Sequence, residues 1–274
     1  LSTSERKLEP HSLGYNHYGH DANDAFLLRF GRFLSGRLGD GFDSLLAQQN
    51  QDSFQLPNQP KQGKGLWLLG HMLAEAESGW DFTPRFNARC MNVAPLDLNC
   101  LLYITERTLF EGYSTLKNRQ KSKQWKSIAK NRKELINKLF YDKHTGWYWD
   151  YDLAKHEIHF NHNAAQFMPY FVGLANHNSR NKTALMELSN LYIGRFGIYP
   201  CLPQAKNSSA MATNRVHWKT QWDSPNAWPP LMHFGAQAID NYSNGHGKSS
   251  SLLKAKRNQL IMSFLESVEV QFAN

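Results

Sequence analysis

The chain has 274 residues, of which 13% are aromatic and 20% are charged, so it is long enough to bury a sizeable core and is not a disordered chain. No apolar run approaches the roughly 20 residues of a membrane-spanning helix, and we expect no membrane span. The net charge of +8 comes from dispersed basic residues, which favours an ordinary basic surface over a nucleic-acid partner.

Helical periodicity recurs along the chain, whereas the two-residue alternation typical of strands is nearly absent. The spacing of apolar residues predicts helices over 23–37, 64–77, 97–117, 122–140, 164–175, 182–195, 227–240 and 251–271. We therefore expect an all-α fold with no sheet larger than a hairpin. The loops at 78–95, 141–162 and 197–230 are aromatic and rich in Gly and Pro, so we expect them to carry the functional site.

Two segments differ in composition from the rest. Residues 1–63 are rich in Gln, Asn, Gly and His, and the stretch 45–65 reads as a flexible loop or linker. We therefore divide the chain into a divergent, loop-rich segment 1–63 and a helical segment 64–274.

The densest basic stretch, 117–138, keeps one apolar stripe at helical spacing that only Arg132 interrupts, which predicts a helix with its lysines on the solvated face.

The sequence offers no set of metal ligands. Its three cysteines are an odd number without a Cys-x-x-Cys motif, which supports neither a metal site nor a disulfide framework. His156, His159 and His162 alternate without matched ligands, a pattern typical of loop or surface histidines. We therefore expect no metal and no cofactor. Glycosylation sequons at Asn181, Asn207 and Asn241 favour a secreted or cell-surface protein, although about this many arise by chance.

The stretch "QWDSPNAWPP" at 221–230 concentrates two tryptophans, an Asp, an Asn and three prolines in ten residues. Indole rings can cover the apolar faces of a pyranose, while amide and carboxylate groups take its hydroxyls. The prolines stiffen the loop. This pattern favours a sugar site. The structural alternative is a rigid turn that packs its own tryptophans, in which Asp223 only caps or orients the loop.

The stretch "AEAESGWDFTPRF" at 74–86 places Glu77 and Asp81 beside a Gly and a Trp after a predicted helix. Glycoside hydrolysis needs two carboxyl groups that flank the scissile bond, one of them an acid. A carboxyl group beside an indole in a dehydrated cleft is suited to that role. The alternative for such a carboxylate is a helix cap or a hydrogen-bond acceptor within the loop.

With these residues the sequence resembles the trehalases, glycoside hydrolase family 37. "QWDSPNAWPP" matches a family signature position for position, and "AESGWDF" resembles the segment that carries the general acid. Partial resemblances follow in the family's order at "PLDLNCLL" (95–102), "LFYDKHTGWYWDYD" (139–152) and "PYFVGLAN" (169–176). Together they cover about residues 74–271. For the Asp-Tyr-Asp at 150–152 we favour a scaffold loop that forms hydrogen bonds.

The resemblance implies an (α/α)6 toroid, with the active site in the loops at one end, and hydrolysis of α,α-trehalose to two glucose molecules with inversion. Asp81 falls on the general acid, Gly79 falls on a glycine whose backbone contacts the sugar, and Trp80 lies between them. The second signature implies the pocket-lining residues Gln221, Trp222, Asp223, Asn226 and Trp228. The implied ligand is trehalose or a related α-glucoside.

The sequence also departs from the family pattern. The first signature of the family has no copy in this sequence. The family's Arg-Pro-Glu element, which should precede Asp81, has no clean copy in residues 1–63. The family's general base is a Glu in a Glu-Lys-Tyr or Glu-Lys-Phe segment, and residues 264–274 resemble only the helix before it. Neither Glu266 nor Glu269 has the context of the base. We therefore expect an incomplete toroid whose general base lies beyond Asn274. By itself, this chain should hydrolyse trehalose poorly or not at all.

Two alternatives stay open at the level of sequence. The chain could be a catalytically inactive homologue that binds trehalose or a related glucoside, as the missing base favours. An alternative of another class is a basic helical interaction module whose aromatic loops bind a macromolecule, against which the ten-residue signature argues.

Overall fold

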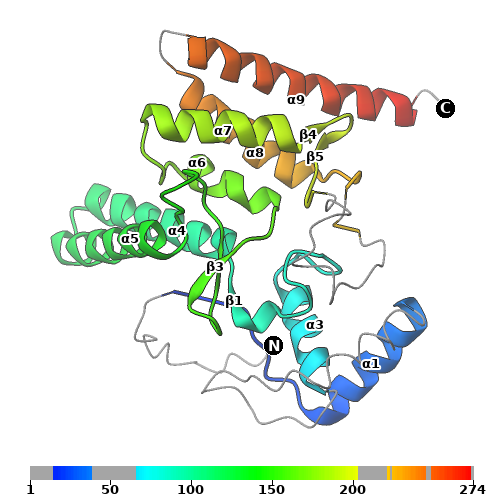
Figure 1. Cartoon of the computed structure of the whole chain (residues 1–274). Helices are drawn as coiled ribbons and strands as arrows, with labels where there is room; N and C mark the ends of the chain where they lie inside the picture. The colour runs from blue at the N-terminus through cyan, green and yellow to red at the C-terminus, as the bar shows by residue number, and fades with distance from the viewer. Residues whose placement is uncertain (1–14, 39–65, 203–220, 223, 245–247, 273–274) are drawn as a thin grey trace.

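The computed structural model describes residues 15–38, 66–202, 221–222, 224–244 and 248–272 (Figure 1). The fold in these residues is mostly helical, as predicted. The α-helices are α1 (Asp24–Leu38), α3 (Leu66–Glu77), α4 (Leu96–Thr115), α5 (Arg119–Leu139), α6 (Met168–Phe171), α7 (Ser179–Tyr192), α8 (Pro229–Ser243) and α9 (Lys248–Phe272). Two 3-10 turns, η1 (Cys90–Asn92) and η2 (Ala164–Phe167), complete the helical structure.

The predicted helix 164–175 is shorter than expected. It consists of the 3-10 turn η2 followed by the single-turn helix α6, which ends at Phe171. Gly173 then takes a φ of +66°, a left-handed conformation that ends the helix and that glycine adopts without a steric penalty. The other predicted helices match one observed α-helix each, with ends that differ by a few residues.

Helices α4 and α5 form a hairpin at one side of the molecule (Figure 1). The side chain of Asn118 caps α5 by accepting a hydrogen bond from the Lys121 N–H at 3.1 Å. Arg132, the exception in the apolar stripe, reaches across the hairpin to Glu106, with 2.7 Å between Nε and Oε1. A charged residue can therefore occupy this stripe because a mostly buried carboxylate faces it.

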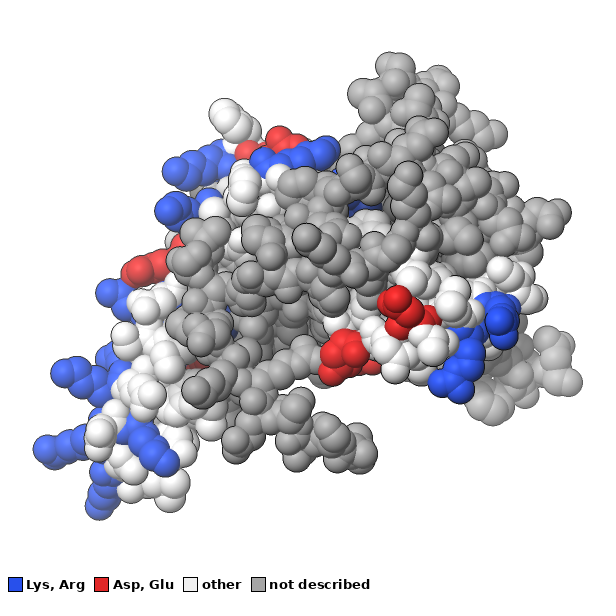
Figure 2. All heavy atoms as spheres, turned by 90° about the horizontal axis from the view of Figure 1, so that it is seen from below, with Lys and Arg blue, Asp and Glu red and all other residues white. Residues whose placement is uncertain are grey.

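Most lysines of α5 lie on its exposed face, as the sequence predicts. Exposed lysines occur at Lys121, Lys123, Lys126, Lys130 and Lys138. Figure 2 shows basic side chains projecting at the edge of the molecule formed by this hairpin.

The expectation of no sheet larger than a hairpin is wrong. Strands β1 (Val93–Ala94), β2 (Asp150–Asp152) and β3 (Glu157–His159) form an antiparallel three-stranded sheet with β2 in the centre. Strands β4 (Ile193–Gly194) and β5 (Gly197–Ile198) form a separate hairpin. Each strand has only two or three residues, too few to show a two-residue alternation in the sequence. The sheet also joins segments more than 50 residues apart, since Val93 pairs with Asp152.

The buried apolar residues form two clusters. A small one joins α1 to α3 and contains Leu27, Leu34, Leu68, Leu69, Met72 and Ala88. The large one extends from the end of α3 to α9, and partly buried Trp222 and Trp228 pack against it. The loops after α3 and before α8 are thus attached to the same core. Within the described part of the chain, no helix is long and apolar enough to cross a membrane.

Candidate functional site

The segment that carries Asp81 is a tight turn at the end of α3. The N–H of Ser78 donates to the Ala74 carbonyl at 3.1 Å, and the Ser78 hydroxyl accepts the Trp80 N–H at 3.1 Å. Gly79 has a φ of +77°, which a residue with a side chain rarely adopts. The turn reverses the chain and leaves Asp81 partly exposed, while Glu77 lies exposed on the helix before it.

Asp81 contacts the second signature directly. The Gln221 side-chain amide donates from Nε2 to Asp81 Oδ2 at 2.6 Å and to the Asp81 backbone carbonyl at 3.2 Å. Both partners are acceptors, so this end of the side chain must be the NH2 group. The two residues are 140 positions apart, and the fold brings their loops together.

The second loop is closed by its own hydrogen bonds. The Gln221 carbonyl accepts from Asn226 Nδ2 at 3.2 Å and from Trp228 Nε1 at 3.0 Å. Trp228 also stands at the N-cap of α8, whose first residue is Pro229. These contacts hold Gln221 in place independently of its side chain. Asp223, predicted to line the site, lies outside the described residues.

Three tryptophans connect the two loops. The rings of Trp80 and Trp222 are 4.7 Å apart, and those of Trp222 and Trp228 are stacked at 5.0 Å. Asp81, Trp222 and Trp228, which the resemblance assigns to one site, are therefore brought together by the fold. The structural alternative is also visible in part, because Trp222 packs against both other indoles. Trp80 is only 6% exposed and Gly79 is exposed, and the sugar contacts of these residues stay predictions.

Beneath Trp80 lies a buried ion network that the sequence analysis missed. The guanidinium of Arg85 is fully buried and makes two hydrogen bonds of 2.8 Å to Asp97 and two, at 2.7 and 2.9 Å, to Asp150. Its central carbon lies 4.6 Å from the Trp80 ring centroid, and Trp80 Nε1 donates to Asp97 at 2.8 Å. The network anchors the tryptophan that carries the stack. Arg85 and Asp97 lie in the quoted motifs, but their pairing leaves no local signal.

The charges in this network are locked. Burial disfavours the ionised form of Asp97, but the Arg85 guanidinium and the hydrogen bonds to the carboxylate hold its pKa below the usual range. Burial likewise opposes the charge of Arg85, while Asp150 and Asp97 hold its pKa well above the usual value. Asp150 also accepts the Leu96 N–H at 2.8 Å. The prediction that 150–152 forms scaffold hydrogen bonds is confirmed, although the segment is strand β2.

A second buried carboxyl group lies closer to Asp81. Glu75, in the last turn of α3, is 2% exposed and accepts the Thr83 N–H at 3.0 Å. Burial raises its pKa to about 8, although hydrogen bonds from the backbone of Thr83 and Phe82 lower it and the charge of Asp81 raises it further. Glu75 is therefore a neutral acid at neutral pH. No local pattern in the sequence predicts a neutral Glu75, since the burial of this residue depends on the loop that folds over it.

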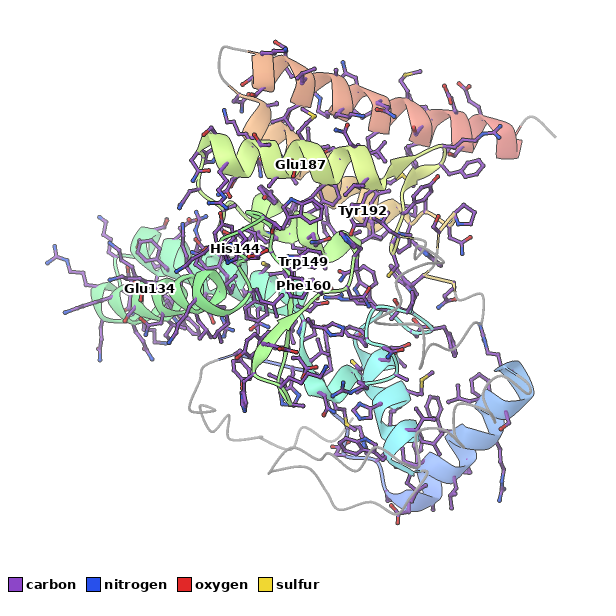
Figure 3. All side chains as sticks on the ribbon, in the orientation of Figure 1. Glu134, His144, Trp149, Phe160, Glu187 and Tyr192 are labelled. Carbon is purple, nitrogen blue, oxygen red and sulfur yellow. The ribbon has the colours of Figure 1, made fainter. Side chains whose placement is uncertain are left out.

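Of the predicted loop histidines, His162 packs in a separate aromatic cluster, whereas His159 ends strand β3 with its Nε2 3.2 Å from the Arg85 carbonyl oxygen. The rings of His162 and Trp149 are 4.9 Å apart. Trp149 in turn contacts Phe160 at 5.3 Å, and both of these residues are labelled in Figure 3. Trp147 joins the cluster and donates from Nε1 to Glu187 of α7 at 3.1 Å. In the part of the chain that the structure describes, no group of three or more His, Cys, Asp or Glu residues could hold a metal ion.

The protein-family model named Trehalase matches residues 64–274, which is well over half of the chain. The chain belongs to the trehalase family. The periplasmic trehalase of Salmonella agona (strain SL483) is 31% identical over 194 residues, covering 68% of this chain and 31% of that protein. The putative periplasmic trehalase of Salmonella typhi is 31% identical over 175 residues, covering 61% of this chain and 28% of that protein. The chain thus spans about a third of the length of these curated relatives.

The fold agrees with this family. The neutral trehalase of Saccharomyces cerevisiae superposes with a TM-score of 0.65 at 20% identity, covering 95% of this chain and 47% of that structure. A structure described as a sialidase also superposes, with a TM-score of 0.54 at 12% identity, over 85% of this chain and 20% of that one. These likenesses show the all-α fold of the trehalase family in this chain. The match to the Trehalase family model, rather than these structures, argues against a basic helical interaction module.

Proposed function

We propose that this chain forms the part of an inverting trehalose hydrolase, within residues 64–274, that carries the general acid, Asp81. The observation that carries the proposal is the contact between Asp81 and Gln221. It joins two family motifs, far apart in sequence, around one partly exposed carboxyl group. The ligand is trehalose or a related α-glucoside, and the substrate rests on the family.

The geometry gives the acid a defined proton position. Gln221 Nε2 can only donate, so Asp81 Oδ2 must accept, and the proton of the neutral acid resides on Oδ1. Within the described residues Oδ1 accepts no hydrogen bond from the protein. An inverting hydrolase needs an acid that protonates the glycosidic oxygen while a second carboxylate activates water from the opposite face of the ring. The proposal assigns the delivery of that proton to Oδ1 of Asp81.

The remaining predicted residues would form the walls around this acid. The indole of Trp228 covers one sugar face, and Asn226, Asp223 and the backbone at Gly79 take hydroxyl groups. Trp222 and Trp80 hold the stack in place from behind, because Trp222 contacts both other rings. Aromatic rings and amide groups in one place are the combination that a pyranose needs.

The test uses the purified 274-residue chain and two readouts, trehalose binding by calorimetry and glucose release. Asp81→Asn should keep binding and lower glucose release by about 100- to 10,000-fold, the usual loss on removing a general acid. Trp228→Leu should weaken binding. Asp240→Asn and Trp125→Leu, on α8 and α5, are the matched controls and should leave both readouts unchanged.

Binding with little or no turnover is the result that the sequence predicts for this chain. Failure of the unmodified chain to bind trehalose, or a measurable glucose release that Asp81→Asn leaves unchanged, would contradict the proposal.

A further inference from the structure

Glu75 connects the end of α3 to the segment that follows Asp81. Its Oε1 accepts the N–H of Thr83, two residues beyond Asp81, and its own backbone carbonyl accepts the Ser78 hydroxyl at 2.6 Å. The residue therefore holds the 78–83 segment at both ends. Its other oxygen, Oε2, is buried and has no hydrogen-bond partner among the described residues. A buried oxygen left in this way is costly for an ionised carboxylate and tolerable for a neutral acid.

The charges around Glu75 are few. His71, one turn earlier on α3, has its pKa lowered to about 3 by burial and is neutral at neutral pH. Cys90 of η1 senses the Glu75 charge, but burial raises the pKa of its thiol, so it too is neutral. Asp81 is the charged group, among those described, that acts on Glu75 from the loop. At neutral pH, Glu75 therefore acts on the loop through its hydrogen bonds.

We propose that Glu75 is a positioning residue for Asp81: from the last turn of α3 it fixes the 78–83 segment by accepting the Thr83 N–H and the Ser78 hydroxyl. This inference rests on the proposed role of Asp81 as general acid. Asp81 lies between these two attachment points, so the position of its carboxyl group depends on both of them.

The test follows hydrogen exchange at the Thr83 N–H by NMR in the 274-residue chain. It needs no substrate, so its failure differs from failure of the proposed function. Glu75→Gln keeps a carbonyl oxygen for this N–H and Glu75→Met removes it, so exchange at Thr83 should quicken only in the Met variant. The matched control is Glu77→Met, on the exposed face of the same turn, which should leave exchange at Thr83 unchanged.

A second readout separates positioning from a merely structural role. In any glucose release that the chain shows, Glu75→Met should lower kcat and leave KM unchanged, because Glu75 is buried and the segment that it holds carries Asp81. Glu75→Gln should restore kcat. Hydrogen exchange at Thr83 that is equal in the unmodified and Glu75→Met chains would overturn the proposal.

Discussion

The acidic residues around Trp80 differ in their burial and in their hydrogen-bond partners. Asp97 and Asp150 are held by four hydrogen bonds from the buried Arg85. Asp81, by contrast, is partly exposed and is held by one amide, Gln221. The carboxyl groups are chemically alike, and their surroundings decide what each can do.

The difference shows that nearby acidic residues can be held in two ways, two of them in a buried ion network and one, the proposed general acid, partly exposed. A carboxylate paired with a guanidinium in a dry environment stays ionised and cannot release a proton to a substrate. Asp81 has no cation beside it in the described structure and keeps one oxygen free of the protein. Glu75 is intermediate, since it is buried like the ion network but has no cation beside it either.

The strongest way to break the comparison is to remove the cation. Arg85→Met should lower the free energy of unfolding by about 3–5 kcal/mol, because Asp97 and Asp150 would face one another without a counter-charge. Urea unfolding measures this. Arg89→Met is the control: Arg89 is a quarter exposed and lies 3.7 Å from Asp152, so its loss should cost about 1 kcal/mol or less. An equal loss of unfolding free energy in the two variants would show that the buried ion network does not stabilise the turn.

A second test uses the pH dependence of stability at Glu75. Its pKa is raised from 4.5 in the unfolded chain to about 8 in the folded one, so between these values the folded state binds more protons. Stability should therefore fall as the pH rises through this window. Glu75→Gln removes the effect, so this variant should gain on the unmodified chain by a few kcal/mol, on the order of one per pH unit, between pH 4.5 and 8.

Thermal unfolding across this range measures the gain. Glu77→Gln, exposed on the same helix, should run parallel to the unmodified chain. A constant difference between Glu75→Gln and the unmodified chain at every pH would show that Glu75 is not a neutral buried acid.

The smallest expected effect on stability sharpens the other side of the comparison. Gln221→Ala removes two hydrogen bonds to Asp81, one to its partly exposed carboxylate and one to its backbone carbonyl, and should cost about 1 kcal/mol, because the Gln221 carbonyl still holds Asn226 and Trp228. Any glucose release that the chain shows should fall more, by roughly tenfold or beyond, since the acid loses its orientation. Gln237→Ala, which loses an exposed hydrogen bond to Asn241 on α8, should affect neither activity nor trehalose binding. Unchanged activity in Gln221→Ala would mean that the amide does not orient Asp81.

Several features of this protein were predictable from sequence because they depend on residues that are close together in the chain. The 3.6-residue spacing of apolar side chains predicts the long helices, and the motifs around Asp81 and Trp228 predict the family. The basic helix 117–138 was also predictable, since its lysines must avoid the apolar stripe. The exception at Arg132 was not predictable in this way, because Glu106, which pairs with it, lies on the neighbouring helix α4.

Other features were decided only by the tertiary structure. The strands β1–β3 are too short to leave a pattern and exist because Val93 meets Asp152 across the fold. The pairing of Arg85 with Asp97 and Asp150, the burial of Glu75 and the hydrogen bond from Gln221 to Asp81 depend on which residues the packed helices bring together. Charge state and hydrogen bonding are properties of the surroundings. The sequence by itself therefore determined the family and the helices, and the packed core decided which carboxyl groups are held by a buried cation and which one stays partly exposed.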